Sequence, residues 1–299
     1  MQLTLIIGDE DEPQTHKFAE YLRRQGYDVH CFLVTDFPDK LGVSWSPDCG
    51  QGKLHLGKLE CRFESIKSIY WHRTEPMPNG NHTEQSTWLK KERFSALSPL
   101  FHCNGIRWVN SFSAIQYHLN KPRQLNHAVR LGATIPPTYI GNSVEEADSF
   151  LSNHKQCIYK PVQGGTTTKV VTKAHRNKAH LAQALSKAPI TLQARVGVTN
   201  VRSYVIGNQI FSAELATEAV DFRDDAATDA KVIDLPFPER DLARRLCRGF
   251  GMEWCAIDWR RDEAGQYYFL EANPCPYFIH FENVTSLPIS RELGHLLVH

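Results

Sequence analysis

The sequence predicts an α/β protein in which an N-terminal parallel sheet is followed by helices and antiparallel hairpins. Residues 3–34 form an apolar run, a helical pattern and a second apolar run, and this β-α-β order is typical of a parallel sheet with a right-handed crossover. Two later segments, 202–213 and 255–273, each hold two strand-like runs around a turn, which indicates antiparallel hairpins. The 299 residues suffice for two domains, or for one domain with two lobes.

The first 115 residues are expected to form one sheet-containing region. A buried strand over 3–7 leads into a helix from Pro13 to Gln25, which Gly26 ends, and a second strand covers 29–34. The other elements expected here are a meander of short strands over 42–60, a strand over 66–72, a helix over 83–103 and a strand at 108–110.

The rest of the chain is expected to alternate helices and strands. One continuous helix is predicted over 113–131, with Ser113 as its N-cap, and a second over 143–153 begins with a capping box of Ser143 and Glu146. The remaining expected elements are an extended segment at 135–140, strands at 157–161, 170–171 and 190–193, a helix over 177–187, the hairpin over 202–213 with its turn at Gly207–Asn208, a helix over 239–250, and strands near 255–260 and 267–273.

Composition excludes several classes of protein. The net charge is +1 and no long basic block occurs, so bulk affinity for nucleic acid is not expected. The longest apolar runs, such as 3–7, are far too short to span a bilayer, and the N-terminus lacks the pattern of a signal peptide. We therefore expect a cytoplasmic protein that binds neither nucleic acid nor membrane, and the residues leave open whether it forms a homodimer.

Cysteine and histidine spacing does not indicate a zinc site. The eight cysteines contain no CxxC pair, and the fourteen histidines contain no HExxH. Cys275 stands out because it follows the strand that carries Glu271 and Asn273, although a packing role is the favoured interpretation.

The most informative stretch is the late hairpin, which carries Asp258 on its first strand and Glu271 and Asn273 on its second. Glu271 and Asn273 share a face because side chains alternate along a strand. Two carboxylates and an amide oxygen on one surface suit Mg²⁺, which prefers oxygen ligands and shares its shell with phosphates. Singly, each of these residues would more often be an ordinary turn residue.

A second polar cluster is expected near Lys160, which ends a strand just before a loop containing Gly164 and Gly165. Small residues let backbone N–H groups approach phosphate oxygens, and lysine supplies a compact positive charge. The loop is neither a Walker A motif nor GxGxxG, and a Gly-Gly pair alone is usually a turn. Together with Lys121 and the acidic hairpin, however, it indicates a site for Mg²⁺ and ATP.

These motifs, in this order, resemble the ATP-grasp superfamily over about residues 115–290. The resemblance rests on Asn120-Lys121-Pro, Tyr159-Lys160-Pro with its glycine loop, Leu192-Gln193, Val201-Arg202-Ser-Tyr-Val, Ile257-Asp258 and Leu270-Glu271-Ala-Asn273-Pro. A closer similarity is to the graspetide (microviridin-type) peptide macrocyclases and the ribosomal-protein glutamate ligases. It rests on Ile69-Tyr-Trp-His-Arg73, Asn110-Ser, Asp221-Phe-Arg223 and Leu287-Pro-Ile-Ser290.

The resemblance implies a pre-ATP-grasp or substrate domain at 1–115, a central lobe at 116–190 and a C-terminal lobe at 191–299, with the two lobes clamping the nucleotide. It also implies roles for single residues. These are phosphate contacts for Lys121, Lys160, Gly164 and Gly165, adenine contacts for Gln193, Ala194 and Val196, transition-state charge for Arg202 and Arg223, Mg²⁺ ligation for Asp258, Glu271 and Asn273, and a substrate contact for Arg73. Ala194 departs from the family, which commonly has Glu there, so a side-chain contact at this position is in doubt.

Structural alternatives stand beside three of these roles. Arg202 could pair with Glu214 across its hairpin, Arg223 could belong to a solvated charged loop, and Lys121 could lie on a helix surface. The resemblance supplies no obvious general base, and His280 and Glu282, which lie close in sequence to the strand of Glu271 and Asn273, are weak candidates.

The resemblance implies an ATP-dependent ligase that activates a carboxylate as an acyl-phosphate and joins it to an amine or hydroxyl. A peptide or protein substrate is favoured, and a ligase of small amino acids, similar to glutathione synthetase, is the alternative. A non-catalytic nucleotide- or peptide-binding module is a third hypothesis. A dinucleotide oxidoreductase is disfavoured because the turn after the first strand, Gly8-Asp-Glu-Asp, lacks the glycine fingerprint.

Overall fold

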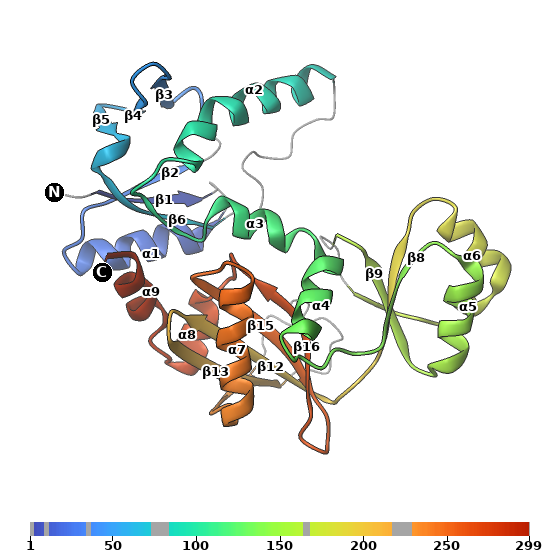
Figure 1. Ribbon diagram of the computed structural model, residues 1–299. Helices are drawn as coiled ribbons and strands as arrows, with labels where there is room; N and C mark the ends of the chain where they lie inside the picture. Colours follow the sequence, from blue (N-terminus) through green and yellow to red (C-terminus); the bar gives the residue numbers. More distant parts are fainter. Residues whose placement is uncertain are drawn as a thin grey trace. The chain divides into compact units, whose positions relative to one another are not determined.

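The computed structural model describes residues 3–8, 12–33, 37–72, 84–163, 168–216 and 229–298. The chain divides into two compact units (Figure 1). Unit 1 comprises residues 1–115, 252–254 and 274–299, and unit 2 comprises residues 116–251 and 255–273.

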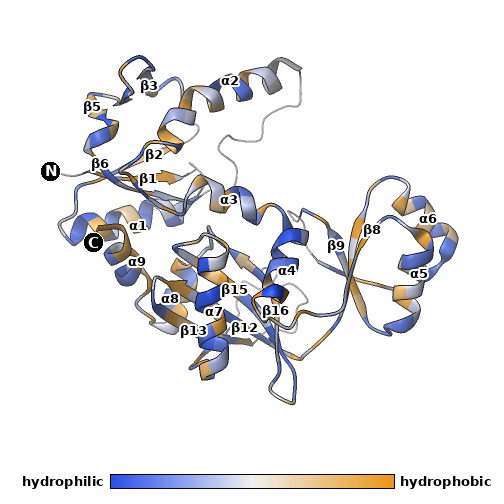
Figure 2. Cartoon of the chain, in the orientation of Figure 1, coloured by the Kyte–Doolittle hydropathy of each residue, from blue (hydrophilic) through white to orange (hydrophobic). Residues whose placement is uncertain are grey.

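Unit 1 is built on a parallel sheet with strand order β2-β1-β6-β7. Its central strand β1 is buried at every residue and is coloured as hydrophobic in Figure 2, as expected for a parallel sheet covered on both faces. The last residue of β1 is Gly8, and helix α1 comes so close there that a Cβ would lie 2.4 Å from Thr15 Cγ2. The elements are β1 (Leu3–Gly8), α1 (Pro13–Arg24), β2 (Val29–Leu33), β6 (Ile66–Trp71) and β7 (Arg107–Val109), which confirms the predicted β-α-β opening.

The remainder of unit 1 covers this sheet. Helix α1 contacts both C-terminal helices, and the last of these also contacts β6. The predicted meander is present as a three-stranded antiparallel sheet. The elements are β3 (Leu41–Ser46), β4 (Gln51–Leu56), β5 (Leu59–Arg62), η2 (Phe63–Ser65), α2 (Glu84–Phe101), α8 (Ile279–Thr285) and α9 (Ile289–Val298).

Cys275 belongs to the apolar core of unit 1, beside Trp71. Its thiol donates to the carbonyl oxygen of Trp71 at 3.4 Å, and burial raises the pKa of the thiol far above its usual range. Because the thiolate is the reactive form, this cysteine packs rather than reacts, as the favoured interpretation of the sequence held.

Unit 2 contains two antiparallel sheets. The smaller has strand order β10-β9-β11-β8, and α5 and α6 pack together beside a core that includes Leu151, Leu181 and Leu192. Ser143 accepts the backbone N–H of Glu146 at 3.3 Å, the N-cap bond that the sequence predicts. The elements are β8 (Thr138–Gly141), α5 (Val144–Asn153), β9 (Cys157–Pro161), β10 (Lys169–Val170), η3 (Ala174–Arg176), α6 (Lys178–Leu185) and β11 (Ile190–Ala194).

The larger sheet of unit 2 has strand order β14-β13-β12-β15-β16. Both predicted hairpins lie in it. The first turns at Gly207, whose φ of 56° suits glycine, and the second joins β15 to β16. Helix α7 contacts β12 and β16, and α4 contacts β16. The elements are β12 (Thr199–Ile206), β13 (Gln209–Ala216), β14 (Asp229–Ile233), α7 (Phe237–Gly249), β15 (Trp254–Arg261) and β16 (Tyr267–Asn273).

The prediction of one helix over 113–131 is wrong. The chain forms α3 (Phe112–His118) and α4 (Lys121–Arg130), separated at Asn120, which caps α4 by accepting the backbone N–H of Arg123 at 3.1 Å. Pro122 explains the break, because its ring would clash with the carbonyl of residue 118 in a continuous helix. The expected N-cap, Ser113, lies inside α3. The break places Lys121 in the first turn of α4.

Among the described helices, none combines the length and the apolar character that a membrane crossing requires.

Candidate active site

The β15–β16 hairpin brings the three predicted metal ligands onto one face of the larger sheet. Asp258 lies directly opposite Glu271 in the strand register, and Asn273, two residues further along, lies opposite Ala256. Directly opposed residues of an antiparallel pair have their Cβ atoms about 4.5–5.5 Å apart. The register shifts immediately after the Asp258–Glu271 pair, so that Trp259 pairs with Phe269 and Leu270 is extra. Such bulges bend a strand locally and are common beside active sites.

Each carboxylate of this face is paired with a cation of the chain. Lys121 Nζ donates to Glu271 Oε2 at 2.7 Å, from the start of α4. Arg202 Nη1 lies 3.2 Å from Asp258 Oδ1, from the neighbouring strand β12, and its Nε donates to the Tyr204 hydroxyl at 3.1 Å. The alternative pairing of Arg202 with Glu214 is therefore wrong, because Arg261 takes Glu214 at 2.6 Å.

Positive charges of the chain keep the Glu271 carboxyl ionised. Burial opposes ionisation of Glu271, yet Lys121, His118 and Lys160 together hold the pKa of this carboxyl well below its usual range. Burying a charge costs desolvation free energy that an opposite charge in contact can offset, and here each carboxylate has a cationic partner.

His118 is a site residue that sequence reasoning missed. It is buried, its Nδ1 donates to the carbonyl oxygen of Ala272 at 2.8 Å, and Lys121 Nζ lies 3.2 Å from its Nε2. Burial, followed by the positive charge of Lys121, lowers the pKa of His118 to about 4. The ring is therefore neutral at physiological pH, with Nε2 as the acceptor. Its position three residues before Lys121 was the available signal.

The lowered pKa of His118 predicts a pH dependence of stability. The unfolded state has a histidine pKa near 6.5, so it binds more protons than the folded state below that pH. The free energy of unfolding is highest above pH ~6.5. It decreases by about 3 kcal/mol as the pH falls from there to the folded-state pKa of about 4. His118→Gln should remove this component. Urea unfolding at pH 4.5, 5.5 and 7 checks it, and parallel pH curves for the two proteins would contradict it.

Gln124 is the second residue that sequence reasoning missed, and it lies three residues after Lys121. Its side-chain amide makes two hydrogen bonds to Ala272, the residue between Glu271 and Asn273: Nε2 donates to the carbonyl oxygen at 2.9 Å, and Oε1 accepts the backbone N–H at 3.0 Å.

The smaller sheet supplies Lys160 to the same site. Lys160 Nζ donates to Gln193 Oε1 at 3.4 Å, and Gln193 Nε2 donates to Thr138 Oγ1 at 2.9 Å. Lys160 also lies close enough to Glu271 to help lower the pKa of its carboxyl. The structure thus brings Lys121, Lys160 and Glu271 together within unit 2.

The predicted adenine segment, Gln193 to Val196, begins in β11. The backbone N–H of Ala194 donates to the carbonyl oxygen of Pro137, and that of Arg195 donates to Gln156, both at 2.9 Å. Val196 follows the strand and is half-buried. The side chain of Ala194 is buried, so it presents no polar group there.

Four predicted site residues, Gly164, Gly165, Arg223 and Arg73, lie outside the described residues. The two candidate bases lie in α8 of unit 1. Glu282 accepts the backbone N–H and the hydroxyl of Ser290, at the start of α9, and His280 is exposed. Glu282 thus has a structural function as a helix cap.

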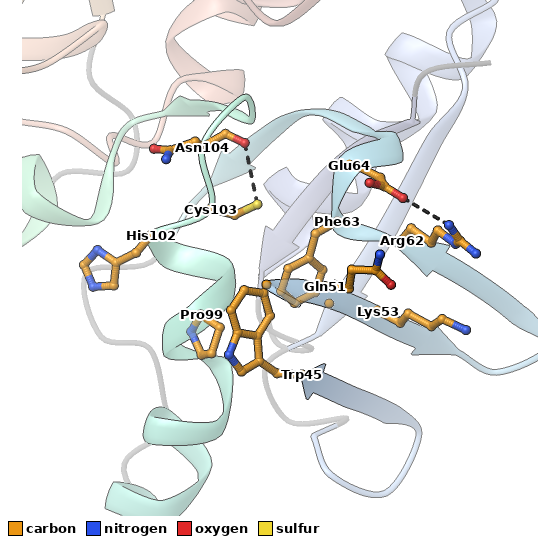
Figure 3. A pocket seen from close by; sticks show the side chains of 12 residues that line it. Trp45, Gln51, Lys53, Arg62, Phe63, Glu64, Pro99, His102, Cys103 and Asn104 are labelled. Carbon is orange, nitrogen blue, oxygen red and sulfur yellow. Dashed lines mark hydrogen bonds and ion pairs between the residues drawn. The ribbon is translucent and has the colours of Figure 1, made fainter. Parts of the chain in front are cut away.

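A separate hollow of about 430 Å³ lies in unit 1, between the β3–β5 sheet and the end of α2 (Figure 3). Trp45 stacks on Phe63 there, with ring centroids 5.9 Å apart. Its two basic residues are already paired, Lys53 with Glu60 at 2.6 Å and Arg62 with Glu64 at 3.2 Å. In the part of the chain that the structure describes, moreover, no three His, Cys, Asp or Glu side chains gather as a metal-binding group. The hairpin face, with two carboxylates and an amide, is the better candidate site.

No protein-family model and no curated protein sequence matches the chain. Solved structures do. The ATP-grasp ligase PsnB, complexed with a variant of its minimal precursor, Mg and ADP, has a TM-score of 0.85 at 24% identity, over 99% of this chain and 97% of that one. The macrocyclase MdnC from Microcystis aeruginosa MRC, bound with the precursor peptide MdnA, has a TM-score of 0.86 at 22% identity, over 99% of each chain. The chain has the ATP-grasp fold.

A third ATP-grasp structure shares this topology. The RiPP-associated ATP-grasp ligase of Chryseobacterium gregarium, in complex with ADP and a leader and core peptide, has a TM-score of 0.86 at 22% identity, over 99% of this chain and 96% of that one. The predicted fold class, an N-terminal parallel sheet followed by two α+β lobes of the ATP-grasp kind, is therefore confirmed.

The residues of the β15–β16 hairpin face fit a magnesium nucleotide. Asp258, Glu271 and Asn273 offer the oxygen ligands that Mg²⁺ prefers, on one sheet face. Each carboxylate already contacts a positively charged side chain, so positive charge beside these oxygen atoms is compatible with the local structure. Lys121 and Lys160 beside them supply the charge that a polyphosphate requires.

Proposed function

We propose that the protein is an ATP-dependent ligase that activates a carboxylate, of a peptide or protein, as an acyl-phosphate and joins it to an amine or hydroxyl. One observation supports this above the others. The face formed by Asp258, Glu271 and Asn273 meets Lys121, Lys160 and Arg202 within one unit of an ATP-grasp fold. A magnesium triphosphate is the ligand that such alternating charges suit.

The roles follow from position. Asp258, Glu271 and Asn273 would hold Mg²⁺, which supplies charge neutralisation and orients the β- and γ-phosphates when bound. Lys121 and Lys160 bind phosphate oxygens, and the backbone of Val196 contacts adenine, since the N–H groups of Ala194 and Arg195 are already donated within the chain. We also propose that Gly164 and Gly165 belong to the phosphate loop and that Gln193 and Ala194 line the adenine pocket. Arg223 is proposed to contact the transferred phosphoryl group, and Arg73 the substrate.

The reaction proceeds in two displacements. A carboxylate oxygen of the substrate attacks the γ-phosphorus of ATP, and the bond to the bridging oxygen breaks to release ADP. A nitrogen or hydroxyl oxygen then attacks the acyl carbon, phosphate leaves with the electron pair of the C–O bond, and the nucleophile loses its proton to solvent or base. Arg202 stabilises negative charge that develops on the transferred group, and the site mainly positions the reactants.

The similar structures favour a peptide as the substrate. PsnB, MdnC and the Chryseobacterium ligase are each bound to a precursor or leader and core peptide. We propose that residues 1–115 form the substrate-side domain, 116–190 the central lobe and 191–299 the C-terminal lobe. We also propose a cytoplasmic location, which is supported by the finding that none of the eight cysteines forms a disulfide.

ADP formation and the mass of the product test the proposal. The protein is incubated with ATP, Mg²⁺ and either synthetic peptides containing Asp or Glu with Lys, Ser or Thr, or free amino acids. We expect ADP formation that depends on a peptide, and a product lighter by one water per bond. Turnover with amino acids alone would favour the small-molecule ligase. Nucleotide binding without turnover on any carboxylate would favour a non-catalytic module.

A further inference from the structure

Strand β16 lies at the edge of its sheet, and it carries two of the three proposed metal ligands. An edge strand has one side on which backbone N–H and C=O groups lack a neighbouring strand. Ala272 is the residue between Glu271 and Asn273, and it is fully buried. The backbone N–H and C=O of Ala272 that point away from the sheet therefore need hydrogen-bond partners. The positions of those partners determine where Glu271 and Asn273 lie.

Gln124 takes the place of the missing strand at this point. Its carboxamide donates to the carbonyl oxygen of Ala272 at 2.9 Å and accepts the backbone N–H of the same residue at 3.0 Å. A carboxamide can do both at once because it carries a donor and an acceptor side by side, as a peptide group does. His118 adds a third bond, from Nδ1 to the carbonyl oxygen at 2.8 Å. Both side chains are buried, so water does not compete for these bonds.

Helix α4 carries both the proposed phosphate lysine, Lys121, and the residue that contacts the ligand strand, Gln124. Gln124 lies three residues after Lys121 in α4, so the two side chains project from the same face of the helix. Lys121 contacts Glu271, and Gln124 contacts the next residue of β16. Any shift of β16 relative to α4 would therefore change the ligand face and the phosphate lysine together.

We propose that Gln124 is a positioning residue for metal binding: its amide holds Ala272 and thereby sets the spacing of Glu271 and Asn273 around Mg²⁺. The inference rests on the proposed function. Gln124 touches neither nucleotide nor metal in this account, and acts only through the backbone of β16. Groups that orient metal ligands in this way affect metal affinity by about 10–100-fold.

Binding of ADP with and without Mg²⁺, measured by calorimetry on the full chain, tests the proposal. Gln124→Met keeps the approximate shape of the side chain and removes both bonds. We expect the enhancement of ADP affinity by Mg²⁺ to fall about 10–100-fold, while affinity in EDTA stays within about twofold of wild type. Hydrogen exchange in the ligand-free protein should show faster exchange at residues 268–274.

Gln14→Met is the matched control. Gln14 is also buried and also bonds the backbone at both ends of its amide, donating to Pro276 at 3.2 Å and accepting from Ile279 at 3.1 Å in unit 1. It should lower thermal stability as Gln124→Met does, without changing the Mg²⁺ enhancement. Gln124→Leu is the second variant: it removes both bonds without adding a charge, and the same fall in the Mg²⁺ enhancement is expected.

Two results would overturn the inference. A Mg²⁺ enhancement equal to or above that of wild type, in either Gln124 variant that folds, would show that the amide only supports folding. Absence of Mg²⁺-dependent ADP binding by the wild-type protein would refute the proposed function, and the role of Gln124 with it. The first result leaves the ligase proposal intact, so the two failures are distinguishable.

Discussion

Glu271→Gln is expected to lower ATP-dependent turnover by at least about 10²-fold, because partners that only orient metal ligands already contribute 10–100-fold. The substitution keeps the size of the side chain and removes the charge that faces Asp258 and accepts from Lys121 at 2.7 Å. Nucleotide binding in EDTA should persist, and its enhancement by Mg²⁺ should be lost. Initial rates of ADP release and calorimetry measure the two effects.

Glu214→Gln provides the control for Glu271. This glutamate lies on β13 of the same sheet and pairs with Arg261 at 2.6 Å, a pairing of similar length and similar partial burial. It lies outside the ligand face, so its loss should leave turnover within about twofold, as expected for a partly exposed ion pair of small energy. If Glu271→Gln kept more than a third of wild-type turnover, the acidic hairpin would not be the metal site.

Arg202→Met is expected to destabilise the protein by about 3–5 kcal/mol, the usual result of removing one partner of a buried ion pair. Both side chains are buried, with 9% exposure for Arg202 and 11% for Asp258, and the guanidinium also donates to Tyr204. The substitution removes the Arg202 cation from beside the buried Asp258 carboxylate. Chemical unfolding, followed by tryptophan fluorescence, gives the change in the free energy of unfolding.

Arg261→Met is the matched control for Arg202. Its pair with Glu214 is more exposed, at 28% and 23%, so its loss should cost less than about 1 kcal/mol. Adding Asp258→Asn to Arg202→Met should recover part of the stability, because the buried negative charge is removed, but should not restore turnover. Equal costs for the two arginine substitutions would contradict the assignment of Arg202–Asp258 as the buried pair.

Much of the fold could be predicted because it depends on local patterns. The alternation around Gly207 indicated a hairpin, and the apolar runs before Asp258 and after Gly265 indicated another. The helix break at Asn120 was predictable in principle, since Asn followed two residues later by Pro is an N-terminal signal, but the periodicity on either side favoured one long helix. The local signal of Asn120 and Pro122 was outweighed by the helical periodicity of the residues on either side.

The contacts of the site depend on residues far apart in the chain. Gln124 and Ala272 are 148 positions apart, and Lys121 and Glu271 are 150 apart, so no window of sequence contains both partners. The bulge at Leu270 lies within the predicted hairpin. It could not be predicted, because one extra residue does not change the kinds of residue that mark the segment as a strand.

By itself, the sequence determined the kinds of ligand and their sharing of a strand face, because side-chain alternation is a property of the local backbone. Only the tertiary structure decided which cation meets which carboxylate. Arg202 meets Asp258 because strand β15 lies beside β12, and sheet order is set by packing between distant segments. On the other side of β12, Glu214 lies opposite Val201 and not opposite Arg202. The tertiary structure also decided that His118 and Gln124 support the ligand strand, since that required α4 to lie against the edge of the sheet.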